Sequence, residues 1–157
     1  NANTPKMSLI NSSVPLPEMI ENSPMNLMRI IHYPPLSSDV TDGALRAAAH
    51  SDINLITVLP AASQSGLQVQ TKKDEWLDVK CDPRWLVINT GDMLQECSDG
   101  HYPSTIHRVV NPVSKYAHLS RYSMPLFIHP RDEVILSKRY SAKKYLDERL
   151  RDIGLKK

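Results

Sequence analysis

The sequence predicts a mainly β fold, a β-sandwich or jelly roll, that ends in a C-terminal helix. Two observations favour this class over an α/β fold. The chain contains about seven short apolar or β-branched runs separated by turn signals, and the helical crossovers that parallel strands require are missing between them. Twelve prolines outnumber five glycines, which is typical of many strand-to-loop transitions. A length of 157 residues fits one domain.

The first part of the chain differs from the rest. Residues 1–25 are polar, punctuated by prolines and without a sustained hydrophobic period. We therefore expect a loop or lead-in there that is disordered or discontinuous with the remainder of the chain. The domain itself is expected at residues 26–157. Its first strand begins at Met25 and stops at Pro34, because proline cannot donate a hydrogen bond to a β ladder.

Three segments occupy the middle of the chain. ALRAAAHSDINLITVLP is predicted to form a strand from about Ala48 to Pro60, although its alanines could also begin a helix. GLQVQ and EWLDVKC alternate apolar and polar residues on either side of TKKD, which predicts a hairpin. WLVINTGD is a continuous apolar run, typical of a strand buried on both faces. Asp92 is expected to cap a short helix over MLQEC.

The last segments are two strands and a helix. STIHRVVNP and RYSMPLFIHP predict the strands, with Pro125 at an edge or a bulge. SAKKYLDERLRDIGL places its apolar residues at helical spacing. Ser141 is the expected N-cap of this helix and Gly154 its stop. Asp147 and Arg151 lie four residues apart and are expected to pair on the solvent side.

Composition argues against several classes of partner. The formal net charge is +2, from 19 basic and 17 acidic residues without a basic stripe, so we expect no nucleic acid. No apolar run approaches the roughly 18 residues that span a bilayer, and no leader is recognised, so we expect no membrane partner. Cys81 and Cys97 lack CxxC spacing and indicate small apolar residues in a reducing, cytoplasmic compartment. The oligomeric state stays open.

A histidine and an aspartate one residue apart form the first candidate site. His50 and Asp52 begin a β-branched, apolar run, and alternating side chains of a strand would point both residues to one face. One neutral and one anionic ligand would then be aimed at a single point. Such a pair is more often a surface hydrogen bond, so a metal site needs a further ligand.

His107 is the best candidate for that further ligand. The chain has six histidines, and His107 has the most strand-like surroundings, whereas His101 and His118 lie in polar, loop-like stretches. Two histidines and one carboxylate on neighbouring strands are the ligand set of non-haem Fe(II) oxygenases, which leaves positions open on the metal. A thiolate-rich set would favour zinc instead.

Arg121 and Ser123 form a second constellation. They also lie two residues apart and therefore on one face of a predicted strand. A guanidinium and a hydroxyl placed in this way can hold a carboxylate. An isolated Arg-x-Ser would be read as a surface feature, but burying an unpaired arginine in an apolar strand is costly. We therefore expect an anionic partner there.

The ordered strings resemble a known family. RIIHYPP, AHSDINLIT, GLQV, LVINTGDMLQ, HRVVNP and RYSMPLF occur in the order and rough spacing of the isopenicillin N synthase-like branch of the Fe(II)/2-oxoglutarate-dependent oxygenases. The resemblance runs from roughly Met28 to Pro130, and its Ile31–Tyr33 stretch is similar to that of bacterial members. Chains of that family are longer, so this one would correspond to the C-terminal catalytic portion, without the N-terminal part of the family fold.

The resemblance implies a fold, a metal site and a reaction. The fold would be a double-stranded β-helix, also called a jelly roll. His50, Asp52 and His107 would bind Fe(II). The cofactors would be Fe(II), 2-oxoglutarate and O₂, and a small-molecule substrate would be hydroxylated or desaturated while 2-oxoglutarate is converted to succinate and CO₂. The primary substrate is not implied.

The resemblance also assigns a co-substrate site. Arg121 and Ser123 would bind the distal carboxylate of 2-oxoglutarate, and Tyr33 would contact the same molecule. Three alternatives remain open. The chain could be an oxidase of this fold that does not use 2-oxoglutarate, or a jelly-roll binding module without catalysis. A zinc cupin is also conceivable, but it does not explain Arg121 and Ser123.

Several other polar residues are interpreted as structural. Asn89 and Gln95 are expected to satisfy polar groups around the site, as buried amides usually do. Arg108 should point to the opposite face of its strand from His107 and pair there. His32 and His129 have no assigned role.

Overall fold

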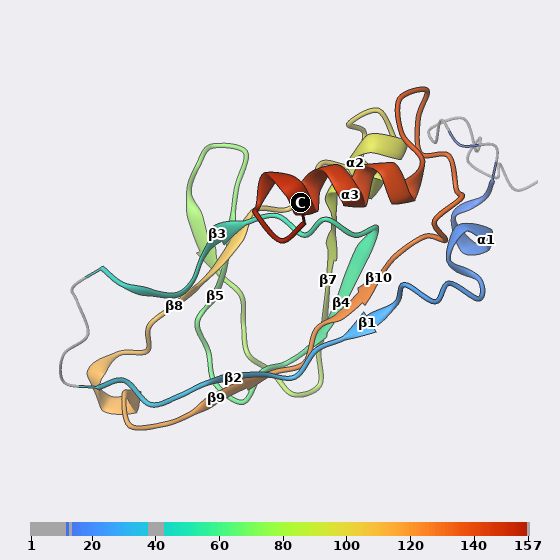
Figure 1. Cartoon of the computed structure of the whole chain (residues 1–157). Helices are drawn as coiled ribbons and strands as arrows, with labels where there is room; N and C mark the ends of the chain where they lie inside the picture. Colours follow the sequence, from blue (N-terminus) through green and yellow to red (C-terminus); the bar gives the residue numbers. More distant parts are fainter. Residues whose placement is uncertain (1–11, 13, 38–42, 157) are drawn as a thin grey trace, which may run out of the picture.

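The computed structural model describes residues 12, 14–37 and 43–156, which form two four-stranded antiparallel sheets and a two-stranded ribbon (Figure 1). A helix crosses one end of the assembly near the C-terminus. The mainly β jelly roll with a C-terminal helix is therefore confirmed. Two predicted regions, residues 1–11 of the lead-in and residues 38–42 of the loop after the first strands, lie outside the described residues.

The first sheet has the strand order β1-β10-β4-β7. The ribbon formed by β2 and β9 continues it, because β1 leads into β2 and β9 leads into β10 along the chain (Figure 1). The strands of the first sheet and the ribbon are β1 (Leu27–Met28), β2 (Ile31–Tyr33), β4 (Ile56–Pro60), β7 (Leu86–Thr90), β9 (Arg121–Ser123) and β10 (Leu126–Ile128).

The second sheet has the order β3-β8-β5-β6 and lies opposite the first (Figure 1). Its strands are β3 (Leu45–His50), β5 (Leu67–Gln70), β6 (Trp76–Asp78) and β8 (His107–Val110). The predicted hairpin is confirmed, since β5 and β6 pair with Val69 opposite Leu77. In the pairing of β3 with β8, His50 lies directly opposite His107. This register already brings two of the predicted metal ligands together.

Three predicted strands are each divided in two. The run from about Ala48 to Pro60 forms the end of β3 and all of β4, which belong to different sheets, with an irregular segment at residues 51–55 between them. The alanines before it are in β3, not in a helix. RYSMPLFIHP likewise forms β9 and β10, because Pro125 falls between them and has no N–H to donate. Met25–Tyr33 is divided into β1 and β2.

The described part of the lead-in is not all loop. Residues 16–20 form helix α1 (Leu16–Ile20), and the side chain of Met19 is fully buried. The expectation of a loop is wrong for this segment, because Leu16, Met19 and Ile20 pack into an apolar cluster that the local sequence does not reveal.

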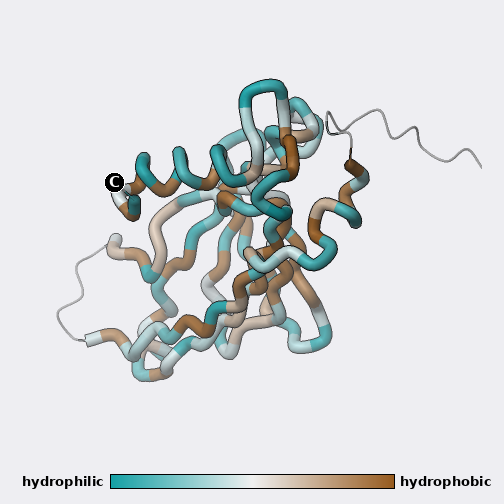
Figure 2. Tube along the Cα trace, turned by 45° about the vertical axis from the view of Figure 1, so that its right-hand side comes forward, coloured by the Kyte–Doolittle hydropathy of each residue, from teal (hydrophilic) through white to brown (hydrophobic). Residues whose placement is uncertain are grey.

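That apolar cluster lies outside the space between the two sheets. It joins α1, the residue 51–55 segment, helix α2 (Asp92–Cys97) and helix α3 (Ala142–Asp152). Its buried members are Met19, Leu55, Met93, Leu94, Cys97, Val134, Leu136 and Ala142. Figure 2 shows hydrophobic residues along the side of α3 that faces the sheets and hydrophilic residues along its other side. The buried members of this cluster therefore do not fill the space between the sheets, which contains a pocket.

The cap and the ion pairs of α3 agree only in part with the predictions. Ser141 caps α3, its side chain accepting a hydrogen bond from the backbone N–H of Lys144, and Gly154 follows with φ +75°. The predicted pairing of Asp147 with Arg151 is wrong, because Asp147 instead forms ion pairs with Lys143 and Lys156.

A short 3₁₀ helix, Ser114–Tyr116, precedes β9. In the described residues, no helix is long and apolar enough to cross a membrane.

Candidate metal centre

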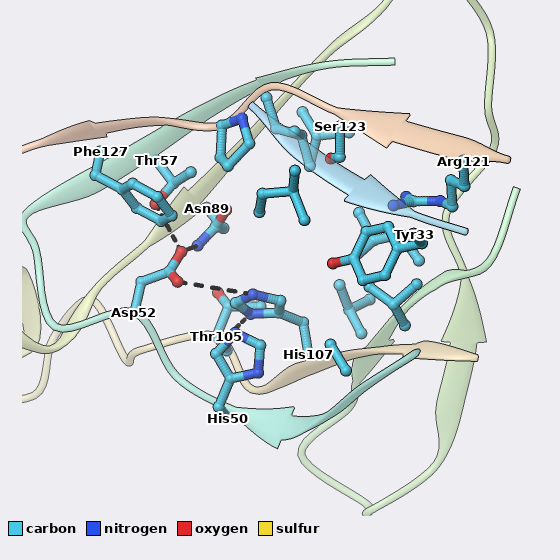
Figure 3. Close-up of a pocket in the computed structure, with 18 residues that line it drawn as sticks. Tyr33, His50, Asp52, Thr57, Asn89, Thr105, His107, Arg121, Ser123 and Phe127 are labelled. Carbon is cyan, nitrogen blue, oxygen red and sulfur yellow. Dashed lines mark hydrogen bonds and ion pairs between the residues drawn. The ribbon is translucent and has the colours of Figure 1, made fainter. Parts of the chain in front are cut away.

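His50, Asp52 and His107 converge at one end of the space between the sheets (Figure 3). Each offers a ligand atom, and these three atoms lie within 4.8 Å of one another. His50 ends β3, His107 begins β8, and Asp52 lies in the irregular segment just after β3. The three side chains that the sequence predicts as ligands are therefore together, although Asp52 is not in the same strand as His50.

The hydrogen bonds of the two histidines leave one ring nitrogen free on each. Nδ1 of His50 lies 2.7 Å from the carbonyl oxygen of Ala48, and Nδ1 of His107 lies 3.0 Å from that of Thr105. A carbonyl can only accept, so each Nδ1 carries the proton. In the neutral form of each ring, Nε2 then has a free lone pair, with which an imidazole binds a metal.

The Asp52 carboxylate is oriented by two donors on a single oxygen. The hydroxyl of Thr57 donates to Oδ2 at 2.6 Å, and the side-chain amide of Asn89 donates to the same oxygen at 2.8 Å. Oδ1 instead points toward His107, whose Nε2 is 3.7 Å away (Figure 3). Asp52 is only 7% exposed, and a buried carboxylate is costly without a compensating positive charge. A metal cation between Oδ1 and the imidazoles would provide one.

Thr57 is a site residue that the sequence analysis missed. Its hydroxyl accepts a hydrogen bond from the Asn54 amide at 2.9 Å, so its own proton is directed to Asp52. Both side chains are almost fully buried. The available signal was the alternation of β4, in which Thr57 shares the inward face with Leu59 and is the only polar residue there.

The start of α2 holds the backbone that carries Asp52. The N–H of Asp92 donates to the carbonyl of Asp52 at 2.8 Å, and the N–H of Met93 donates to that of Asn54 at 3.1 Å. Gly91 is the N-cap of α2, and a Cβ there would overlap the backbone carbonyl of Asn54. Asp92 is thus the first helical residue and not the cap; its carboxylate accepts from Ser51 instead of from the helix backbone.

A second polar constellation lies further along the same pocket. Arg121 is 2% exposed and Ser123 is 6% exposed, and both line the pocket that holds the triad. Nε of Arg121 donates to the carbonyl of Gln64 at 3.0 Å, whereas its Nη1 is buried without a hydrogen-bond partner among the described residues. Burial lowers the pKa of this guanidinium, but an arginine remains charged, so an anionic partner is required for full compensation.

Tyr33 lies beside that arginine. The ring centroid of Tyr33 is 5.3 Å from the Arg121 guanidinium carbon, and its hydroxyl points into the space between Arg121 and the triad (Figure 3). The remaining lining is mostly apolar and comes from both sheets, including Leu59, Leu67 and Val87. A small organic acid could therefore reach the metal position with one end and Arg121 with the other.

The other polar residues behave as structural groups. Gln95 accepts a hydrogen bond from the backbone N–H of Ser104 at 2.7 Å. Arg108 donates to Gln68 at 2.8 Å and stacks over Trp76, away from the pocket, as expected. His32 stacks on Tyr122 at 4.7 Å between ring centroids and does not line the pocket.

A wider groove adjoins the triad beneath α3. Its lining includes His50, Asp52 and Phe127 from the region of the site and, from α3 and its C-terminal end, Leu146, Leu150 and Ile153. His129, which had no assigned role, also lines it; burial lowers the pKa of its imidazole. The groove is therefore lined by two of the three predicted ligands, His50 and Asp52.

Comparison with known proteins points to one family. Residues 24–130 match the model of the 2OG-Fe(II) oxygenase superfamily. A 2-oxoglutarate-dependent dioxygenase of Monascus ruber, citB, is 42% identical over 97 residues, which are 60% of this chain and 30% of that protein. The matched residues span only part of the curated relatives, from 30% of the citB protein to 38% of a flavonol synthase of Crocosmia x crocosmiiflora.

Solved structures agree with this match. A protein of Shewanella oneidensis assigned as an oxygenase superposes with a TM-score of 0.83 at 58% identity, covering 92% of this chain and 53% of that one. A full-length Neurospora crassa protein, solved in complex with alpha-KG, superposes with a TM-score of 0.75 at 29% identity, covering 85% of this chain and 46% of the other. The similar proteins come from bacteria, fungi and plants, so the bacterial assignment stays a prediction.

Proposed function

The chain belongs to the 2OG-Fe(II) oxygenase superfamily, and we propose that it is the catalytic portion of a non-haem Fe(II)- and 2-oxoglutarate-dependent dioxygenase. In this proposal His50, Asp52 and His107 hold Fe(II), and the substrate is a small molecule that is hydroxylated or desaturated. Iron and 2-oxoglutarate would supply the oxidising chemistry, with O₂ as oxidant and succinate and CO₂ as products.

The chain's own residues would bind and orient these groups. The two Nε2 lone pairs and Oδ1 of Asp52 would hold the metal at the end of the pocket. Thr57 and Asn89 would keep Oδ1 turned toward the metal by holding Oδ2. The mostly apolar lining would limit the access of water.

Among the described residues, Nη1 of Arg121 is buried and has no hydrogen-bond partner, and this observation supports the use of 2-oxoglutarate. A guanidinium can bind a carboxylate through two parallel hydrogen bonds, and the Ser123 hydroxyl on the same face of β9 could add a third. Tyr33 would complete this end of the pocket from β2. The distal carboxylate of 2-oxoglutarate is the group we assign here, while its other end would reach the metal.

The proposal is tested by stepwise anaerobic titration. Fe(II) should bind stoichiometrically to the purified chain, and 2-oxoglutarate should then produce a visible charge-transfer absorption. His107→Ala should abolish the first step. Arg121→Ala should keep iron binding and lose the second step, whereas Arg108→Ala, which removes a guanidinium from the opposite face, should keep both.

Two outcomes would contradict the proposal. Unchanged Fe(II) affinity in His107→Ala would exclude the ligand assignment. Iron binding without any response to 2-oxoglutarate, and without succinate after admission of air, would favour the oxidase alternative over the dioxygenase.

A further inference from the structure

Arg46 is a half-buried cation on the same strand as the first metal ligand. Nε and Nη1 of its guanidinium are buried and have no hydrogen-bond partner among the described residues. Leaving such donors unpaired is costly. His50 follows on β3, about 13 Å further along the strand at a rise of about 3.3 Å per residue. A single strand therefore carries a metal ligand at one end and an incompletely satisfied arginine near the other.

The guanidinium of Arg46 joins β3 to both strands of the ribbon formed by β2 and β9. Its Nη2 donates to the carbonyl of Pro34 at 3.1 Å and to that of Leu119 at 3.3 Å. Pro34 directly follows β2, and Leu119 lies two residues before β9. One side chain of the second sheet therefore ties the adjoining ends of both ribbon strands to β3.

The tied ends of the ribbon carry two of the residues proposed for the distal carboxylate of 2-oxoglutarate. In the antiparallel register of β2 with β9, Tyr33 lies directly opposite Arg121. The Tyr33 ring is close to both guanidiniums, since its centroid is 6.0 Å from Cζ of Arg46 and 5.3 Å from Cζ of Arg121. A displacement of the ribbon relative to β3 would therefore move Tyr33 and Arg121 away from their present positions relative to His50.

The two arginines also place two positive charges at this end of the pocket. Among the described residues, neither Arg46 nor Arg121 forms an ion pair with a carboxylate. Burial and, to a smaller extent, the charge of Arg46 lower the pKa of Arg121. Both guanidiniums remain charged at neutral pH, so they repel each other. An anion bound by Arg121 would offset that repulsion, and the charge of Arg46 therefore favours a carboxylate there.

Arg46 would act on a bound acid without touching it. It is not among the residues that line the pocket of the triad, whereas Tyr33, Ala47 and Arg121 are. Its effect on that pocket would therefore pass through the position of the ribbon and through its charge.

We propose that Arg46 is a positioning residue for the co-substrate. It fixes the ribbon that carries Tyr33 and Arg121 relative to the strand that carries His50, and its charge strengthens the binding of the distal carboxylate. This inference rests on the proposed function, because it assigns Arg46 to the 2-oxoglutarate end of that site.

The binding of two related acids tests the inference. 2-Oxopentanoate has the carbon chain of 2-oxoglutarate but lacks the distal carboxylate, so it reports on the metal end of the pocket alone. Arg46→Gln should weaken the binding of 2-oxoglutarate to the Fe(II)-loaded chain by about 10-fold or more, because a nearby positive charge and the tie to the ribbon are lost. The affinities for Fe(II) and for 2-oxopentanoate should stay unchanged. The visible absorption that each acid produces under anaerobic conditions measures its affinity.

Two further variants separate the charge of Arg46 from a general effect of substitution. Arg46→Lys keeps the positive charge but loses the planar guanidinium, so it should bind 2-oxoglutarate more tightly than Arg46→Gln and less tightly than the parent chain. Arg84→Gln removes an exposed guanidinium that pairs with Asp82 and should leave all three affinities unchanged.

Three outcomes would overturn the inference: parent-like affinity for 2-oxoglutarate in Arg46→Gln, an equal loss of affinity for both acids, or a loss of Fe(II) binding. The last two would mean that Arg46 supports the fold as a whole. Equal affinities in Arg46→Lys and Arg46→Gln would overturn the contribution of charge. Failure of the proposed function would look different, because the parent chain itself would then show no absorption change with 2-oxoglutarate.

Discussion

The Asp52 carboxylate is held through one oxygen so that the other is presented to the pocket. Two side chains from neighbouring strands, Thr57 of β4 and Asn89 of β7, donate to Oδ2. Such partners of a metal ligand fix its orientation and set its basicity. At the scale of single residues, the site therefore depends on a hydroxyl and an amide that do not themselves touch the metal position.

Removing the amide tests this dependence. Asn89→Ala should weaken Fe(II) binding by about 10- to 100-fold, because the carboxylate loses one of its two orienting hydrogen bonds. Anaerobic titration of the variant and the parent chain measures the difference. Asn111→Ala is the matched control, since the Asn111 amide bonds the carbonyl of Ala44 outside the pocket. Equal Fe(II) affinity in Asn89→Ala and the parent chain would show that the hydrogen bond from Thr57 alone orients the Asp52 carboxylate.

At the scale of elements, the irregular segment at residues 51–55 is as important as the strands. It carries Asp52 and connects β3 of one sheet to β4 of the other. Helix α2 holds it through backbone hydrogen bonds from Asp92 and Met93. The close approach between α2 and this segment requires a glycine at position 91, because a side chain would overlap the Asn54 carbonyl.

A substitution at this glycine should affect both stability and the site. Gly91→Ala should lower the free energy of unfolding by about 1–3 kcal/mol, as overpacking does, and should weaken Fe(II) binding because the segment must shift. Urea unfolding and iron titration measure the two effects.

Gly100→Ala separates the two effects as a control. Its Cβ would meet no atom within 4 Å, but its φ of +77° makes alanine strained, so stability should fall by about 1–2 kcal/mol while iron affinity stays unchanged. If Gly91→Ala behaved in the same way, α2 would not position the Asp52 segment.

At the scale of the whole molecule, stability at high pH depends on the apolar cluster outside the sheets. Cys97 lies fully buried in it, and this burial raises the pKa of its thiol from the usual 9.0 to about 11. Between about pH 9 and pH 11 the folded chain keeps a proton that the unfolded chain loses. The stabilisation is therefore fully present below pH 9 and is lost as the pH rises toward 11.

Alkaline unfolding measures this contribution. The free energy of unfolding should fall by at most about 1.4 kcal/mol per pH unit on account of this thiol. Urea titrations at several pH values between about 8 and 11, on the parent chain and on Cys97→Ala, give the comparison. The variant should show the shallower decline, although its stability at the lowest pH is lower. Parallel curves would mean that Cys97 ionises normally in the folded chain.

The sequence by itself determined the class of fold and the identity of the clustered residues. Alternating apolar residues and turn signals are local, so they are readable before folding, and they predicted the β5–β6 hairpin and the Ser141 cap correctly. The order of the short motifs indicated the family. His50, Asp52 and His107 were predicted as a group, and they do converge.

Only the tertiary structure decided which distant residues surround these side chains. The register of β3 with β8 places His50 opposite His107, and Thr57 reaches Asp52 only because β4 and the preceding segment fold together. The burial of Met19 and the exposure of Ile88 were both misjudged from the sequence. The same physical reason explains these differences. The hydrophobic pattern of the sequence identifies side chains that favour apolar surroundings, whereas their actual burial depends on which distant segments cover them in the fold.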